Sequence, residues 1–221
     1  MSPGKIIAEF IGTFFLVLVI GMTALDSGLP AGLAPVAIAA VLASLIFAFG
    51  HVSGAHFNPA VTLAITLRGK MPRSETGPYM LTQIIAAVLA ALICLWASSA
   101  GAAESGDANA ITPLDLQIVP TMIFETLFTF ALVTVILNVA VARRQAGNHF
   151  FGLAIGLVVL AGAYVAGPVS GGAFNPAVTF GLGTLGIADW ADVWMHFCGQ
   201  IAGSLLAVAA FSLTEGPEET A

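Results

Sequence analysis

The segment Ser53-Gly54-Ala55-His56-Phe57-Asn58-Pro59-Ala60-Val61-Thr62 decides how this chain folds, because it returns almost unchanged as Ser170-Gly171-Gly172-Ala173-Phe174-Asn175-Pro176-Ala177-Val178-Thr179. A second similarity precedes each copy, since residues 122–137 echo residues 6–20 with Glu125 in the place of Glu9. The chain is therefore an internal duplication.

Each copy predicts a short helix that begins at its Asn-Pro-Ala triplet. Asparagine is a preferred N-cap and proline is favoured at the first helical position. The apolar runs 58–67 and 175–184 are too short to cross a bilayer at about 1.5 Å per residue, yet they reach through half of a ~30 Å hydrocarbon core. Paired half-helices of this kind indicate a polar path between them, because non-helical backbone at membrane depth is tolerated where it lines a water-filled cavity.

The composition indicates an integral membrane protein. Of 221 residues, 58% are hydrophobic and 8% are charged, and the mean hydropathy is +0.99; a soluble domain is excluded by such values. Cys94 and Cys198 both lie inside apolar stretches, so neither a disulfide framework nor a metal site is predicted. The chain offers no basic surface for nucleic acid.

Six apolar segments are long enough to span a membrane, which makes the expected fold all-α. The predicted spans cover residues 6–25, 33–50, 79–98, a segment from about 118, 150–167 and 193–213. The basic residues fall in three short segments: Lys5; Arg68, Lys70 and Arg73; Arg143 and Arg144. The positive-inside rule places these segments, and with them both termini, in the cytoplasm.

The duplication divides one channel domain, residues 1–221, into two repeats. The first repeat covers about 1–100 and the second about 118–214, with an external connector at about 99–117 and an acidic tail at 215–221. Because each repeat contains three crossings, the two repeats must enter the membrane from opposite sides, which makes an inverted repeat.

The doubled Asn-Pro-Ala, in its Ser-Gly-Ala-His context, resembles the aquaporin and aquaglyceroporin family over essentially the whole chain. The resemblance implies an aquaporin-like fold, six transmembrane helices plus two re-entrant half-helices, and a homotetramer with one pore per subunit and no cofactor. It further implies a multi-pass protein in the inner membrane of a bacterium. The family places the two triplets at the pore centre: Asn58, Pro59, Ala60, Asn175, Pro176 and Ala177.

The loops before the half-helices are expected to present backbone carbonyls to the pore as successive acceptors, as in similar channels. The residues concerned are Gly54, Ala55, His56 and Phe57 in the first loop, and Gly171, Gly172, Ala173 and Phe174 in the second. The opposed half-helices aim two positive dipole ends at the midplane, where they disfavour cations and leave neutral solutes unaffected. Each Asn amide is free to donate to a passing oxygen.

Glu9 and Glu125 lie inside apolar spans, where a carboxylate is costly and usually functional. One interpretation is a proton relay in a coupled transporter. The other is that each carboxylate accepts hydrogen bonds from the unpaired N–H groups of its re-entrant loop. Two symmetric carboxylates fit two duplicated loops, and the family uses matching glutamates in this way.

The sharpest departure from the family is Val178, because most aquaporins carry an arginine at this position of the outer constriction. Counting from the motifs, the other constriction positions fall on Ile38, Ala163 and Gly172. All four arginines of the chain lie in segments predicted to be cytoplasmic, so none can replace the missing one. These four residues predict a wide, apolar outer constriction without strict water selectivity.

The leading hypothesis is a passive channel for small uncharged solutes, with water permeating as well. Candidate solutes are glycerol-like polyols, urea and neutral metalloid hydroxides such as arsenous acid, and larger arsenicals are conceivable without the arginine. The chain resembles a bacterial branch in which an aliphatic residue replaces this arginine and which is associated with arsenic resistance. The alternatives are an ordinary water and glycerol facilitator, an ion-coupled secondary transporter and a structural membrane junction. No constellation of catalytic residues is visible, so an enzyme is not expected.

Overall fold

The fold is a bundle of helices, seen in a computed structural model that describes residues 1–25, 30, 32–105 and 113–215. Six helices are long and apolar enough to cross a membrane, which confirms the predicted all-α membrane fold. They are α1 (Pro3–Ala24), α2 (Ala34–Ser53), α4 (Arg73–Ser105), α5 (Ile118–Ile136), α6 (Phe151–Ser170) and α8 (Val193–Glu215). A π-helical turn, η1 (Leu137–Val141), continues α5, and a 3₁₀ turn, η2 (Arg143–Gln145), follows it.

Two short helices, α3 (Pro59–Leu67) and α7 (Pro176–Leu185), begin at the two Asn-Pro-Ala triplets. Each starts with an extended asparagine as N-cap and a proline in the first turn. The Oδ1 atom of Asn58 accepts a bond from the Ala60 amide at 2.8 Å, and that of Asn175 accepts one from the Ala177 amide at 2.9 Å. These caps satisfy amides that a helix start leaves without a partner inside the helix.

Helix α4 is longer at both ends than the predicted span 79–98. It begins at Arg73 and contains Pro78. The helix tolerates this proline because a proline near a helix N-terminus removes few intrahelical bonds. The helix continues to Ser105 through an alanine-rich segment that favours helix. The first residues of the predicted connector 99–117 are therefore helical; residues 106–112 lie outside the described part, as do 216–221 of the predicted tail.

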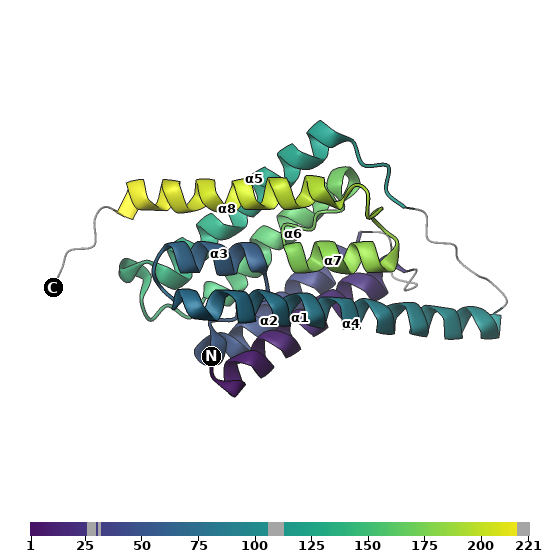
Figure 1. The fold of residues 1–221 in the computed structure, drawn as a ribbon, viewed down its shortest axis with the longest axis horizontal. Helices are drawn as coiled ribbons and strands as arrows, with labels where there is room; N and C mark the ends of the chain where they lie inside the picture. The colour runs from purple at the N-terminus through teal and green to yellow at the C-terminus, as the bar shows by residue number, and fades with distance from the viewer. Residues whose placement is uncertain (26–29, 31, 106–112, 216–221) are drawn as a thin grey trace.

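The two repeats pack in the same way. Helix α1 lies against α2 and α4, and α5 lies against α6 and α8. The repeats meet where α2 packs on α6 and α4 packs on α7. Figure 1 shows α3 and α7 end to end between α4 and α8, so that the two half-helices together take the place of one crossing.

Glycines allow the long helices to cross closely. A Cβ atom on Gly199 would lie 2.8 Å from the carbonyl oxygen of Met122, where α8 crosses α5. A Cβ atom on Gly156 would lie 2.9 Å from the carbonyl oxygen of Ala39, where α6 crosses α2. Small residues bring helix backbones together in lipid, where packing must replace the hydrophobic effect.

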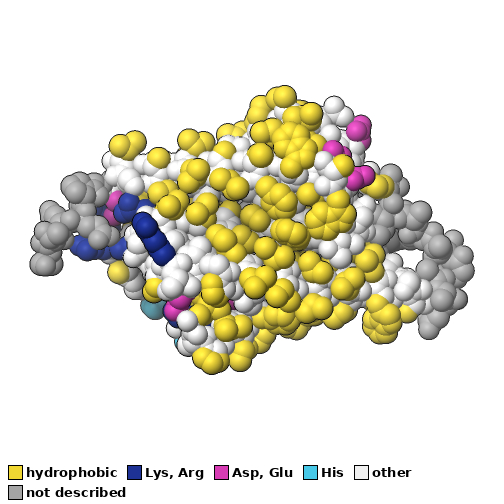
Figure 2. Space-filling model, in the orientation of Figure 1, with side chains coloured by type: hydrophobic (Ala, Val, Ile, Leu, Met, Phe, Trp, Pro, Cys, Tyr) yellow, Lys and Arg dark blue, Asp and Glu magenta, His cyan; other side chains and the backbone are white. Residues whose placement is uncertain are grey.

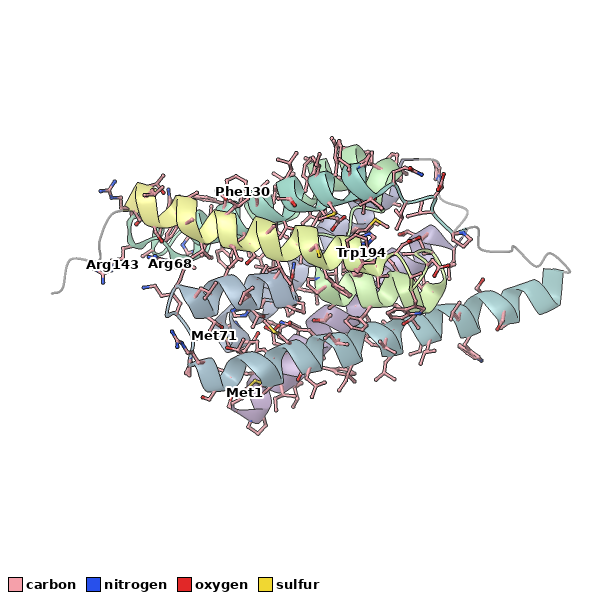
Figure 3. All side chains as sticks on the ribbon, turned by 45° about the horizontal axis from the view of Figure 1, so that its top comes forward. Met1, Arg68, Met71, Phe130, Arg143 and Trp194 are labelled. Atoms are coloured by element: carbon pink, nitrogen blue, oxygen red, sulfur yellow. The ribbon has the colours of Figure 1, made fainter. Side chains whose placement is uncertain are left out.

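The face of the bundle seen in Figure 2 is apolar along its length and carries charged side chains toward its ends. Trp96 is 70% exposed and Leu205 is 47% exposed, as expected for side chains that face lipid. One end holds the start of α1, the end of α3, the start of α4 and the turn η2. The basic residues of these segments are Lys5, Arg68, Lys70, Arg73, Arg143 and Arg144, and we call this end the basic end. Figure 3 places Arg68 and Arg143 at this end and Trp194 toward the other.

Candidate pore and its two re-entrant loops

Two loops enter the bundle between α2 and α3 and between α6 and α7, and their backbones adopt left-handed conformations. The angle φ is positive at Gly54 (87°), Ala55 (50°), Phe57 (48°), Gly171 (80°), Gly172 (63°) and Phe174 (48°). A residue with a Cβ atom loses about 1–2 kcal/mol in this region. The loops therefore need strong bonds to the surrounding helices.

The first loop is held by the carboxylate of Glu9, which is fully buried in α1. Its Oε1 atom accepts bonds from the Ser53 hydroxyl at 2.7 Å and the His56 amide at 2.9 Å. Its Oε2 atom accepts bonds from the Phe57 amide at 2.7 Å and the Gln83 side chain at 2.8 Å. Four donors around an acceptor-only carboxylate compensate for its removal from water.

The second loop repeats this arrangement around Glu125 of α5, which is also fully buried. Its Oε1 atom accepts bonds from the Ser170 hydroxyl at 2.7 Å and the Ala173 amide at 3.0 Å. Its Oε2 atom accepts bonds from the Phe174 amide at 2.8 Å and the Gln200 side chain at 2.8 Å. The two carboxylates thus hold equivalent atoms of the two loops.

A further donor reaches the last carbonyl of the helix before each loop. The Tyr79 hydroxyl donates to the Ser53 carbonyl at 2.8 Å, and Nε2 of His196 lies 2.7 Å from the Ser170 carbonyl. Carbonyls at a helix end have no partner inside the helix, and water is not available to them at membrane depth. These side chains supply the missing partner.

Sequence reasoning missed these supporting residues, which are Ser53, Thr62, Tyr79 and Gln83 in the first repeat, and Ser170, Thr179, His196 and Gln200 in the second. The offset of 117 positions between the motifs was a usable signal. It pairs Gln83 with Gln200, the same polar residue type inside apolar spans of both repeats. A polar side chain repeated at that offset indicates a structural bond in both halves.

The two loops are joined directly by their asparagines. Nδ2 of Asn58 donates to the Phe174 carbonyl at 2.9 Å, and Nδ2 of Asn175 donates to the Phe57 carbonyl at 2.9 Å. Both asparagines are 4% exposed. Each amide group carries two N–H donors, and one of them holds the opposite loop.

A cavity of about 730 Å³ runs along both loops from the basic end. Lys5 and Lys70 line it at that end. Both asparagines of the triplets line it, whereas Pro59, Ala60, Pro176 and Ala177 do not. All eight loop residues expected to present carbonyls line it too: Gly54, Ala55, His56, Phe57, Gly171, Gly172, Ala173 and Phe174. The two half-helices therefore turn their N-termini toward one cavity.

The structure brings the four residues expected at the outer constriction to this same cavity. Ile38 comes from α2, Ala163 from α6, Gly172 from the second loop and Val178 from α7. None of them is charged. Among the described residues that line the cavity, the only Lys, Arg, Asp or Glu side chains are Lys5 and Lys70.

Taken together, the helices and the cavity define a membrane protein in which two half-helices meet end to end beside a lined passage. The sequence matches the major intrinsic protein family over residues 2–211. It is 35% identical to Aquaporin NIP1-1 of Zea mays, over 95% of this chain and 74% of that protein. It is 32% identical to Aquaporin Z of Rhodopseudomonas palustris, over 100% of this chain and 96% of that protein.

The fold is also that of a solved member. The X-ray structure of the aquaglyceroporin from Plasmodium falciparum superimposes with a TM-score of 0.80 at 21% identity and covers 94% of both chains. The chain belongs to the major intrinsic protein family, the family of the aquaporins and aquaglyceroporins. Members of this family are passive channels rather than enzymes, and the present chain is a membrane channel of this kind.

Proposed function

We propose that the channel conducts small uncharged solutes through a wide filter formed by Ile38, Ala163, Gly172 and Val178. The observation that carries the proposal is that these four uncharged side chains line one cavity with both loops. A glycine, an alanine and a valine occupy little space, and none of the described residues that line the cavity is an arginine. Glycerol-like polyols, urea and neutral metalloid hydroxides such as arsenous acid fit this description, and water passes with them.

Charge supports a preference for neutral solutes. Helices α3 and α7 point their N-termini at the middle of the cavity, and each N-terminus is equivalent to roughly half a positive elementary charge. The only charged side chains along the described lining are two lysines at the basic end. A cation therefore meets unfavourable potential at the basic end and again at the centre, whereas a neutral solute does not.

An ion-coupled transporter is the less suitable candidate. It would need a carboxylate on the path to bind a coupling cation, and of the described residues lining the cavity none is Asp or Glu. Both oxygens of Glu9 and both of Glu125 are occupied by donors from the loops. Support of the loops is the role that we propose for both carboxylates.

The first test is solute permeability of proteoliposomes measured by stopped flow with water, glycerol and arsenous acid. Val178→Arg is expected to reduce glycerol and arsenous acid flux by about ten-fold or more and water flux by less, since a guanidinium adds bulk and positive charge. Val178→Leu is the matched control, because it adds one methylene without charge. Equal permeabilities in all three proteins would contradict the proposed filter.

An ordinary water and glycerol facilitator is the second candidate, favoured by the names of the relatives, which are aquaporins and an aquaglyceroporin. The same assay separates the two once methylated arsenicals are added as test solutes, because an ordinary facilitator is expected to exclude solutes larger than glycerol. Passage of methylated arsenicals through the native protein, lost in Val178→Arg, is the expected result for the wide filter.

We further propose that the chain lies in the inner membrane of a bacterium as a homotetramer with one pore per subunit. The basic end then faces the cytoplasm together with both termini, since basic residues concentrate there. Native mass spectrometry of the solubilised protein measures the oligomer. A cysteine introduced at Arg144 should react with an impermeant reagent only after the cells are opened.

A further inference from the structure

We propose that His196 is a positioning residue for solute selectivity, acting through the carbonyl that it caps at the end of α6. This inference rests on the proposed solute-channel function. His196 is fully buried in α8, and it is not among the residues that line the cavity. Any effect of His196 on selectivity must therefore pass through the residues that it holds.

The capped carbonyl belongs to Ser170, the last residue of α6. A ring nitrogen 2.7 Å from a carbonyl oxygen must carry the proton, so Nε2–H donates to Ser170. The other ring nitrogen, Nδ1, is buried without a hydrogen-bond partner among the described residues. Within the described part of the chain, the bond to the Ser170 carbonyl is thus the one hydrogen bond that the His196 side chain makes.

Ser170 connects this bond to the proposed filter within two residues. Its hydroxyl accepts a bond from the Gly172 amide at 3.2 Å and donates to Glu125 at 2.7 Å. Gly172 lines the cavity in a left-handed conformation with φ of 63°. A displacement of the Ser170 backbone therefore moves Gly172, and with it the width of the passage.

The first repeat shows which substitution should preserve the contact. There Tyr79 caps the Ser53 carbonyl in the equivalent way, and the Ser53 hydroxyl accepts from the Ala55 amide at 3.0 Å. Ala55 is not one of the four filter positions. The chain therefore uses an imidazole and a phenol for the same bond, and only the imidazole supports the loop that contributes to the filter.

The test compares His196→Phe with His196→Tyr in proteoliposomes that contain equal amounts of protein. Phenylalanine removes the donor, and we expect the ratio of glycerol to water permeability to change by about five-fold or more. Tyrosine restores the donor, and the ratio should return to within about two-fold of the native value. His196→Met is a second variant without a donor, for use if the phenylalanine variant does not fold, because methionine adapts to irregular space.

The outcomes separate this inference from the proposed function. A native ratio in stable His196→Phe or His196→Met protein would overturn the role of His196. Failure of His196→Tyr to restore the ratio would overturn the role of the donor. Native protein that passes neither water nor glycerol would instead contradict the solute-channel proposal, whatever the variants do.

Discussion

The two re-entrant loops make the same four bonds to a buried glutamate but present different side chains to the cavity. In both, a buried glutamate accepts two loop amides, a serine hydroxyl and a glutamine amide. The positions that differ are Ala55 against Gly172, His56 against Ala173, and Tyr79 against His196. Support is duplicated because both loops must satisfy backbone groups away from water, whereas the lining is free to differ.

The second loop carries the smaller residues at two of these positions. In the first loop, the His56 ring lines the cavity and its Nδ1 atom lies 3.1 Å from the Thr62 hydroxyl. The equivalent position of the second loop is Ala173, which has no such group. The smaller residues thus stand in the loop that also contributes Gly172, consistent with a wide filter at that side.

The largest expected effect comes from the two carboxylates. Glu9→Gln and Glu125→Gln each place an NH₂ group where one loop amide and one side-chain donor point, so about 4 kcal/mol of stability should be lost in either variant. Thermal unfolding in detergent and water permeability would measure the loss. If one substitution is tolerated and the other is not, the two loops are not equivalently supported.

The next effect concerns the bonds that cross between the loops. Asn58→Asp and Asn175→Asp keep the capping oxygen but remove the donor to the opposite carbonyl, at a cost of about 2 kcal/mol each. The new carboxylate also attracts cations to the positive helix ends. Potassium flux into liposomes should appear in both variants and be absent from native protein; flux in only one would show that the two asparagines differ.

A smaller effect concerns how tightly helix glycines pack against the rings of Phe57 and Phe174. A Cβ atom on Gly12 would overlap the ring of Phe57, whereas one on Gly162 would lie 2.7 Å from the ring of Phe174. Overpacking a buried ring costs about 1–3 kcal/mol, so Gly12→Ala should lower the unfolding temperature more than Gly162→Ala. The reverse order would mean that the second ring is held more rigidly.

The smallest effect concerns the left-handed position that is Ala55 in the first loop and Gly172 in the second. Gly172→Ala imitates Ala55, and its Cβ atom would meet the Gly167 amide nitrogen at 3.3 Å. We expect a cost of about 1 kcal/mol and reduced glycerol flux, because a methyl group enters the filter. Ala55→Gly is the matched control and should leave the glycerol-to-water ratio close to native; a changed ratio there would place part of the filter in the first loop.

Much of this architecture is readable from neighbouring residues. Apolar runs of sufficient length predict the spans, because a bilayer requires them, and Asn-Pro at each motif predicts the half-helix starts through local capping. The register of the duplication pairs Glu9 with Glu125 before any contact is known. Helix α4 ends at Ser105, beyond the predicted span 79–98, since polar composition outside the membrane does not stop an alanine-rich helix.

The contacts that shape the cavity come from residues far apart in the chain, and only the tertiary structure reveals them. The asparagine bonds between the loops join residues 116 and 118 positions apart, and the caps on Ser53 and Ser170 each span 26 positions. Such bonds depend on where separate helices cross, which no local pattern encodes. Backbone groups buried at membrane depth need hydrogen-bond partners. The packing of α4 and α8 decides which side chains supply them.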